Sequence, residues 1–496
     1  MALANRSVIR TPSALRSGAL TGLAQVVLAL SAAGAGALLA QKFGRSAQTD
    51  GFLSAYGVYL VLVLAAQAFR MVVVPDLTRA AAEGRLAGEG RAYALAFLAL
   101  AVPASTLVAV FSGPLGDLIT GNLPPRASHV AGRALAILVP AAFGQLLAAL
   151  AASALAAVDS YGTAAGGFAL GGIVGVLVFA ALADSQGIVA LVIGLAANAA
   201  VAVAVPVTAL WRRGHLFGPA AKRWALLLRL WHLLQGAAIP LALQGCYLLA
   251  LRFAAKLGVG SVTSFSYAYL AASTLVGATA FSLGVISSAP LTRRGVDPRE
   301  AGRHVVHAGW VSLSIVGAAA GVFALVGGRI VQFVLGSAYR GKVGRELGHL
   351  VVYLSPWMVG WVGFAVTFPL VFVAGRRLML LPLAVVGLLL CIPLGLSLRS
   401  VWGLSGIAIA IGICTLVIAL GLMAMIGTEA LAIAAFGLAR LALAIGATCA
   451  LAFGGLSLAL PAIPAAVLGV CVYAAIVYAT RALGLSEAWL YIRRLH

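Results

Sequence analysis

Charge is scarce in this sequence. Only 9% of its 496 residues are charged, whereas 63% are hydrophobic. Water-soluble domains contain about 25% charged and about 45–50% apolar residues, so this composition excludes a chain of soluble domains. The apolar runs are continuous instead of alternating at every second residue, which excludes a membrane β-barrel. The sequence therefore predicts an all-α integral membrane protein.

Acidic residues and cysteine motifs are also lacking. The twelve acidic residues all lie near the ends of predicted helices or in loops. Proton and sodium relays usually place a carboxylate within a span, so this pattern disfavours a cation-coupled exporter. The five cysteines fall inside apolar runs and have no CxxC spacing. We expect no disulfide, no metal and no cofactor.

Long apolar runs, bounded by charges or by Gly, Pro, Asn and Asp clusters, predict fourteen transmembrane helices. An even number of spans places both termini on the same side of the membrane. Three glycines spaced by four in the fifth span, at 167, 171 and 175, predict close helix packing. The predicted spans are 18–41, 51–74, 92–116, 130–157, 161–183, 187–211, 232–255, 262–289, 309–328, 348–374, 378–398, 402–427, 434–456 and 461–480.

Basic residues are unequally divided between the two sides of this map. Twenty of the 33 lysines and arginines lie on the side that holds the N-terminus, nine lie on the other side, and four fall within spans. The positive-inside rule therefore predicts that both termini are cytoplasmic. This topology accounts for the net charge of +21 without a nucleic-acid partner.

An internal duplication predicts the domain organisation. At an offset of 214 residues, Lys42, Gly44 and Thr49 match Lys256, Gly258 and Thr263. Six predicted helices separate the equivalents, so the two halves have the same orientation. We expect an N-lobe over 1–211 and a C-lobe over 231–427, followed by a helix pair and a cytoplasmic tail over 428–496. The basic segment 212–230 is either an amphipathic linker on the inner surface or an ordinary charged connection.

Three segments carry a resemblance to a known family: AQKFGRSAQTDGFLSAY from Ala40, VVVPDLTRAAAEG from Val72 and GSVTSFSYAYLAAS from Gly260. They resemble the multidrug/oligosaccharidyl-lipid/polysaccharide (MOP) exporter superfamily, and more narrowly its MurJ-like lipid II flippase branch. The resemblance implies a V-shaped pair of lobes around a cavity that opens alternately to each side. It implies transport of a polyprenyl-pyrophosphate-linked sugar from the cytoplasmic to the outer leaflet of a bacterial plasma membrane.

The resemblance also implies partners and candidate roles. The partners would be the lipid-linked oligosaccharide, membrane lipids and envelope-synthesis proteins. The branch lines its cavity with arginines from its first and eighth helices, but the predicted spans 18–41 and 262–289 contain no basic residue. Tyr267 and Tyr269 stand in the eighth span instead. A different cargo and a transport-inactive scaffold therefore stay open as alternatives. A cation-coupled amphiphile exporter of the same superfamily is a separate alternative, which the lack of acids within spans disfavours. We see no catalytic motif and expect no enzyme activity.

Few residues qualify as ligands for a diphosphate. Arg70 lies near the inner end of the second span, and Arg252 precedes Lys256 by one helical turn, which places both on one face. The alternative is that they anchor the helices at the membrane interfaces. Within the spans, Gln244, Tyr247 and Tyr267 are candidates for sugar binding, with interhelical hydrogen bonds as the alternative.

Asp50 is the candidate gate residue. It matches the gate carboxylate of the MurJ-like branch and lies at the outer start of the second span. We expect it to pair with Lys42, Arg45 or Lys256 and so close the outer side. A simple helix N-cap is the competing interpretation.

Overall fold

The computed structural model describes residues 11–158, 160–216, 225–276, 297–374 and 376–479, and within these ranges all regular elements are helical. The chain divides into two compact units. Unit 1 comprises 1–39, 62–112 and 133–234, and unit 2 comprises 40–61, 113–132 and 235–496. Helices α1, Thr11–Phe43, and α2, Ala47–Ala82, each contribute to both units.

The remaining helices follow the predicted order closely. The first group is α3 (Leu86–Val110), α4 (Ser112–Thr120), α5 (Pro125–Ala156), α6 (Tyr161–Gln186), α7 (Val189–Arg212), α8 (Ala225–Ala255) and α9 (Ser261–Val276). The second group is α11 (Pro298–Leu335), η2 (Ser337–Tyr339), α12 (Lys342–Tyr353), α13 (Ser355–Val373), η3 (Arg377–Met379), α14 (Leu380–Ile426), α15 (Thr428–Cys449), η4 (Ala450–Gly454), α16 (Gly455–Ser457) and α17 (Ala462–Ala479).

Ten of the described helices are long and apolar enough to cross a membrane, or eleven if α12 and α13 form one bent span. This confirms a multi-pass all-α membrane protein, while the number fourteen stays a prediction. Two predicted spans, 378–398 and 402–427, lie almost entirely in α14, which is kinked by the non-helical backbone of Gly403. The predicted span 262–289 continues beyond Val276, outside the described residues.

Several predicted boundaries differ from the observed ones. The predicted span 348–374 is broken between α12 and α13, which meet at an angle of 40°. The break precedes Pro356, and a proline favours the first turn of a new helix over the interior of a continuing one. The predicted span 92–116 ends at Val110, and α8 begins within the predicted linker, at Ala225.

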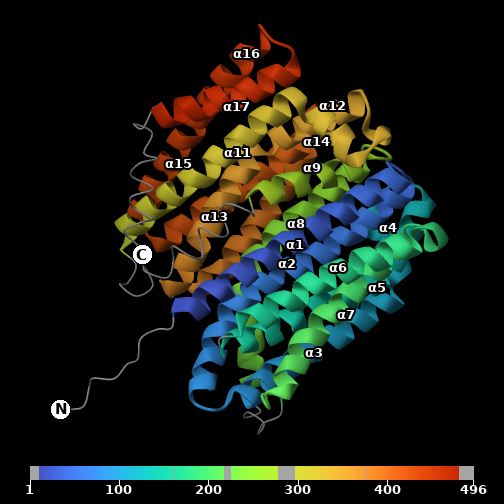
Figure 1. The fold of residues 1–496 in the computed structure, drawn as a ribbon, viewed down its shortest axis with the longest axis vertical. Helices are drawn as coiled ribbons and strands as arrows, with labels where there is room; N and C mark the ends of the chain where they lie inside the picture. Colours follow the sequence, from blue (N-terminus) through green and yellow to red (C-terminus); the bar gives the residue numbers. More distant parts are fainter. Residues whose placement is uncertain (1–10, 159, 217–224, 277–296, 375, 480–496) are drawn as a thin grey trace. The chain divides into compact units, whose positions relative to one another are not determined.

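Unit 1 has its core between α2, α3, α5 and the α6–α7 pair. Tyr93 of α3 is 1% exposed and packs among Val73, Leu77 and Leu155. Helices α6 and α7 lie side by side (Figure 1) because small residues let their backbones approach. A Cβ placed on Gly175 would lie within 2.8 Å of the Gly194 carbonyl oxygen, so the predicted close packing of the fifth span is confirmed.

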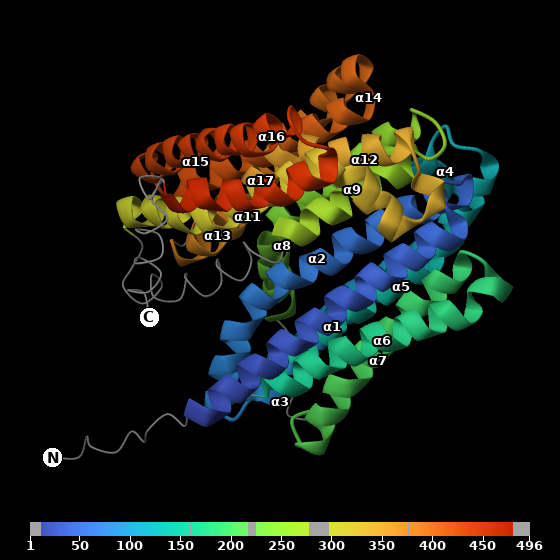
Figure 2. The same cartoon turned by 45° about the horizontal axis from the view of Figure 1, so that its top comes forward.

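Unit 2 contains α11 with the C-terminal helices packed along it, as Figures 1 and 2 show. The Tyr473 hydroxyl on α17 donates a hydrogen bond of 2.8 Å to the Ser314 carbonyl of α11. At Gly317, the absence of a side chain makes room for Ile445 of α15. The C-terminal helices are therefore an integral part of the unit 2 core.

Candidate functional site

The polar site of unit 2 is built around the starts of α2 and α9. Helix α2 is capped by its own chain: the Ser46 hydroxyl accepts a hydrogen bond of 3.2 Å from the Thr49 backbone N–H. The Ser46 and Thr49 hydroxyls are also within 3.0 Å of each other. A serine or threonine at this position satisfies a backbone donor that the first helical turn leaves unpaired. The start of α2 is thus satisfied locally.

Asp50 lies one turn into α2 and is fully buried. Its carboxylate does not cap its own helix but accepts three hydrogen bonds from the start of α9. The Gly260 N–H donates at 2.5 Å, and the Thr263 N–H and hydroxyl donate at 2.8 Å and 2.5 Å. Asp50 is therefore the N-cap of a helix that lies more than 200 residues further along the chain.

The electrostatics of this contact explain how a buried carboxylate is tolerated. Bonds from backbone N–H groups at a helix start favour the ionised form, because the helix dipole is positive there. Arg45 lies beside the same loop and donates from Nε to the Gly260 carbonyl at 3.2 Å. Gly260 adopts a φ of +86°, and a Cβ at this position would lie 2.7 Å from the Arg45 Nε. Glycine is required here because any other residue would be strained at this φ and its Cβ would collide with the Arg45 guanidinium.

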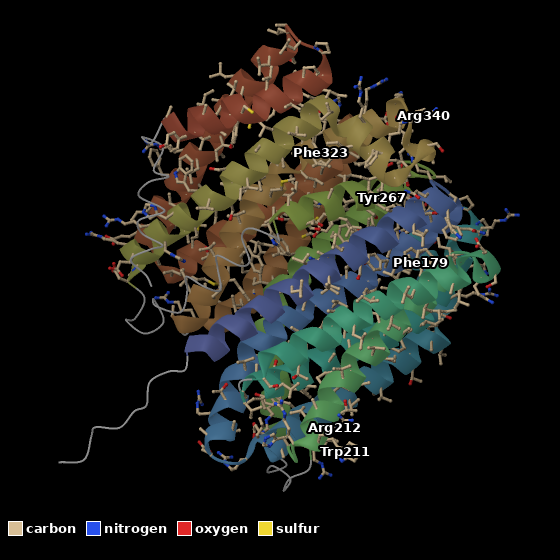
Figure 3. All side chains as sticks on the ribbon, viewed as in Figure 1. Phe179, Trp211, Arg212, Tyr267, Phe323 and Arg340 are labelled. Carbon is tan, nitrogen blue, oxygen red and sulfur yellow. The ribbon has the colours of Figure 1, made fainter. Side chains whose placement is uncertain are left out.

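Aromatic and loop contacts surround this Asp50–α9 contact. Tyr267 of α9 meets Tyr339 of η2 edge to face, with ring centroids 5.7 Å apart. Burial raises the pKa of the Tyr339 phenol, so the group stays neutral. The Gln41 side chain at the end of α1 donates to the Val334 carbonyl at 3.2 Å. Tyr267 is labelled in Figure 3, where its side chain extends from α9.

A second polar cluster lies deeper along α8 and α9. The Gln244 amide donates to the Tyr269 hydroxyl at 3.4 Å, and the Tyr247 hydroxyl lies 3.3 Å from that of Ser266. The rings of Tyr247 and Tyr269 stack with centroids 4.0 Å apart. The Gln244 Oε1 is buried and has no hydrogen-bond partner within the described part of the chain. The structure thus brings Gln244 and Tyr247 together around Tyr269, with one buried amide acceptor that the described residues leave unpaired.

The candidate basic residues occupy different environments. Arg252 packs its guanidinium against Gly121 in the α4–α5 turn, where a Cβ would collide with it. One guanidinium nitrogen, Nη1, is buried and lacks a hydrogen-bond partner among the described residues. Lys256 and Lys42 are exposed. Arg70 lies in α2, but its side chain is outside those that the structure describes.

The sequence did not predict the hydrogen-bond donors of Asp50. We predicted pairing with Lys42, Arg45 or Lys256, or a cap on its own helix. Arg45 does interact electrostatically with the carboxylate, but the hydrogen bonds come from Gly260 and Thr263. The duplication carried a signal, because it aligned Thr49 with Thr263 and Ser46 with Gly260. A capping serine present in the first repeat and absent from the second leaves the α9 start in need of a cap from elsewhere.

Comparison with known proteins rests on structure, since neither a protein-family model nor a curated protein matches the sequence. The lipid II flippase MurJ in an inward closed conformation is similar over 94% of this chain and 99% of its own, with a TM-score of 0.72 and 15% identity. The chain has the fold of the MOP transporters.

Other proteins share the MOP fold with this chain. An inward-facing multidrug-resistance MATE transporter matches over 85% of this chain and 96% of its own, with a TM-score of 0.61 and 14% identity. A MOP transporter from Pyrococcus furiosus, with a binding pocket of reverse polarity, matches over 87% of this chain and 96% of its own, with a TM-score of 0.56 and 15% identity. These MOP proteins are transporters or flippases, which agrees with the absence of a catalytic motif from the sequence.

Proposed function

We propose that this protein is a flippase that moves a polyprenyl-pyrophosphate-linked sugar, lipid II or a related cell-envelope precursor, from the cytoplasmic to the outer leaflet by alternating access. The MOP fold, shared with a lipid II flippase, supports the proposal. The observation that carries it is the buried Asp50 carboxylate on the start of α9. It is a polar contact between the two sequence repeats, on their predicted outer side.

The proposed gate works through this contact. A transporter that alternates must break and re-form the contacts that close each side. Hydrogen bonds to a charged group can close the gate without burying a large apolar surface. When the gate opens, water forms hydrogen bonds with the carboxylate and with the N–H groups of the helix start in their place. In this proposal Asp50 is the gate carboxylate, Arg45 holds the α9 loop through Gly260, and the exposed Lys42 supplies positive charge at the rim.

The proposed substrate contacts follow from what each group offers. Arg252 has a guanidinium nitrogen without a partner among the described residues, and Lys256 lies one turn further on. Together with Arg70 they would bind the pyrophosphate, because guanidinium and ammonium groups pair with phosphate oxygens. Gln244, Tyr247 and Tyr267 would contact the sugar through amide, hydroxyl and ring surfaces. Membrane lipids would accommodate the lipid tail, and envelope-synthesis proteins would supply and consume the precursor.

The test is flipping in reconstituted vesicles with a polyprenyl-pyrophosphate sugar on the inner leaflet. Arg252→Gln and Arg70→Gln are each expected to abolish its appearance outside, since a charged hydrogen-bonding group is lost. Arg126→Gln is the matched control, because Arg126 is exposed on the same predicted outer side as Arg252 and should flip normally. Normal flipping by the protein carrying both substitutions would refute these two assignments.

Two observations favour other functions. The fold is also that of multidrug exporters, which supports a cation-coupled amphiphile exporter. The described part of α9, Ser261–Val276, contains no basic residue, which supports a transport-inactive scaffold. The same vesicles distinguish these functions. An exporter transports a fluorescent cationic amphiphile when an ion gradient is imposed to drive it. A scaffold transports neither the amphiphile nor the lipid-linked sugar.

A further inference from the structure

A cluster of polar and charged residues, buried or half-buried, lies in unit 1 near the predicted cytoplasmic end of α2. It consists of Asp76 on α2, Glu89 and Tyr93 on α3, and Arg229 on α8, and we call it the Glu89 cluster. All four residues belong to unit 1. The proposed gate and substrate site use none of them.

The contacts within the Glu89 cluster are close and shielded from water. Arg229 pairs with the Glu89 carboxylate at 2.5 Å, and the two side chains are 10% and 16% exposed. The Arg229 guanidinium also lies 5.1 Å from the centre of the Tyr93 ring. The Tyr93 hydroxyl donates to the Asp76 carboxylate at 2.6 Å. Arg229 is therefore held by an ion pair and by a cation–π contact at once.

Arg229 lies on the part of α8 that belongs to unit 1, close to the residue at which the helix passes into unit 2. Arg229 lies in the second turn of α8, and residues up to Leu234 belong to unit 1. From Gln235 onward the same helix belongs to unit 2. The Glu89 cluster thus ties the first turns of α8 to α2 and α3, although most of α8 lies in the predicted C-lobe, which begins at residue 231.

A shielded ion pair separates in an all-or-none manner and does not weaken gradually. Once the two side chains separate, each charge must be rehydrated or stay buried without a partner, and the second option is strongly unfavourable. The contact is therefore either made, with the α8 start fixed on α3, or fully broken, with both groups in water. Neighbouring apolar contacts such as that of Tyr93 with the unit 1 core have no such threshold.

We propose that Glu89 and Arg229 form a latch that keeps the first turns of α8 fixed to α3 in unit 1. With the latch closed, residues 225–234 move with unit 1 whatever the remainder of α8 does. The latch does not depend on the identity of the cargo, and its test requires no transport.

The test uses spin labels on the full chain in lipid nanodiscs, in a Cys471→Ala background that removes the exposed cysteine. Labels at Leu95 of α3 and Leu227 of α8, both exposed, report the latch. The expected result is one narrow distance in the parent and in Arg229→Lys, which retains the charge. Arg229→Gln should add a second, longer distance. A label pair at Leu95 and Trp211, on α3 and α7, should not change in any variant.

Hydrogen exchange provides the second measurement. In Arg229→Gln, exchange over 225–234 should rise about tenfold or more, while exchange over 241–255 of the same helix stays as in the parent. The variant that carries both Glu89→Gln and Arg229→Gln leaves no lone buried charge, so it tests the latch even if a single variant fails to fold. An unchanged distance and unchanged local exchange in this double variant would overturn the proposal. So would a uniform loss of protection throughout unit 1, which is what a purely structural role predicts.

Discussion

The starts of α2 and α9 are equivalent in the sequence repeat, yet they are capped in different ways. Helix α2 receives its cap from Ser46, four residues before Asp50 and part of the same turn. At the equivalent position α9 has Gly260, which offers no side chain, and the cap comes from Asp50 of the other repeat. A local cap stabilises one helix, whereas a cap from a distant segment also ties two segments together.

In the proposed gate, this difference is what brings the two segments into contact. Two identical repeats would each satisfy their own helix starts and would have no polar reason to meet. Replacing one capping residue by glycine creates an unpaired helix start, and one buried carboxylate on the other repeat then fills it. The two caps can be compared through the accessibility of a cysteine placed at Ser261, a residue that is buried in the first turn of α9.

Asp50→Ala should have the largest effect. It removes all three hydrogen bonds to the start of α9, at a cost of about 3 kcal/mol to the closed arrangement, since bonds to charged groups are the stronger kind. This corresponds to about a hundredfold shift in the equilibrium. In a Ser261→Cys, Cys471→Ala background, modification by a membrane-impermeant maleimide should accelerate accordingly. An unchanged modification rate would mean that Asp50 does not hold this end of α9 closed.

Gly260→Ser should have the next largest effect, although it restores the serine found in the first repeat. The positive φ of +86° is unfavourable for serine, and its Cβ would displace Arg45. We expect the closed arrangement to lose about 2 kcal/mol, as strained backbone positions typically do. Faster maleimide modification of the Ser261→Cys reporter would agree with this. A slower rate would show instead that a local cap can replace the distant one.

Ser46→Ala should have the smallest effect and serves as the matched control. It removes the local cap of α2, which typically contributes about 1 kcal/mol to helix stability. The midpoint of thermal unfolding should therefore fall slightly. The modification rate of the Ser261→Cys reporter should stay the same, because Asp50 and its bonds to α9 remain. A large acceleration would remove the distinction between the two caps.

The sequence predicted the helical framework well, because each span needs about twenty apolar residues and such runs are visible without any tertiary information. It predicted less well where the chain bends. The kink at Gly403 and the break between α12 and α13 depend on single glycine and proline positions within otherwise apolar runs. Many similar glycines and prolines leave helices continuous, as Pro140 does within α5.

The candidate site was predictable in part. Asp50 was a candidate gate carboxylate through the family resemblance, and that role stays a prediction, whereas Gln244 and Tyr247 were recognisable as polar residues within spans. Their partners were not, because Thr263 and Tyr269 are unremarkable in a sequence of this composition until α2, α8 and α9 are packed together. Arg229 was placed in a linker on the basis of its charge, and its contact with Glu89 appeared only in the folded chain.

The sequence by itself determined that this chain is a bundle of membrane helices, since hydrophobicity and its interruptions are properties of the chain alone. The tertiary structure decided which helix each buried polar group serves. A carboxylate in an apolar surrounding must find donors, and helix starts hold unpaired donors, but only the packing of distant segments brings the two together.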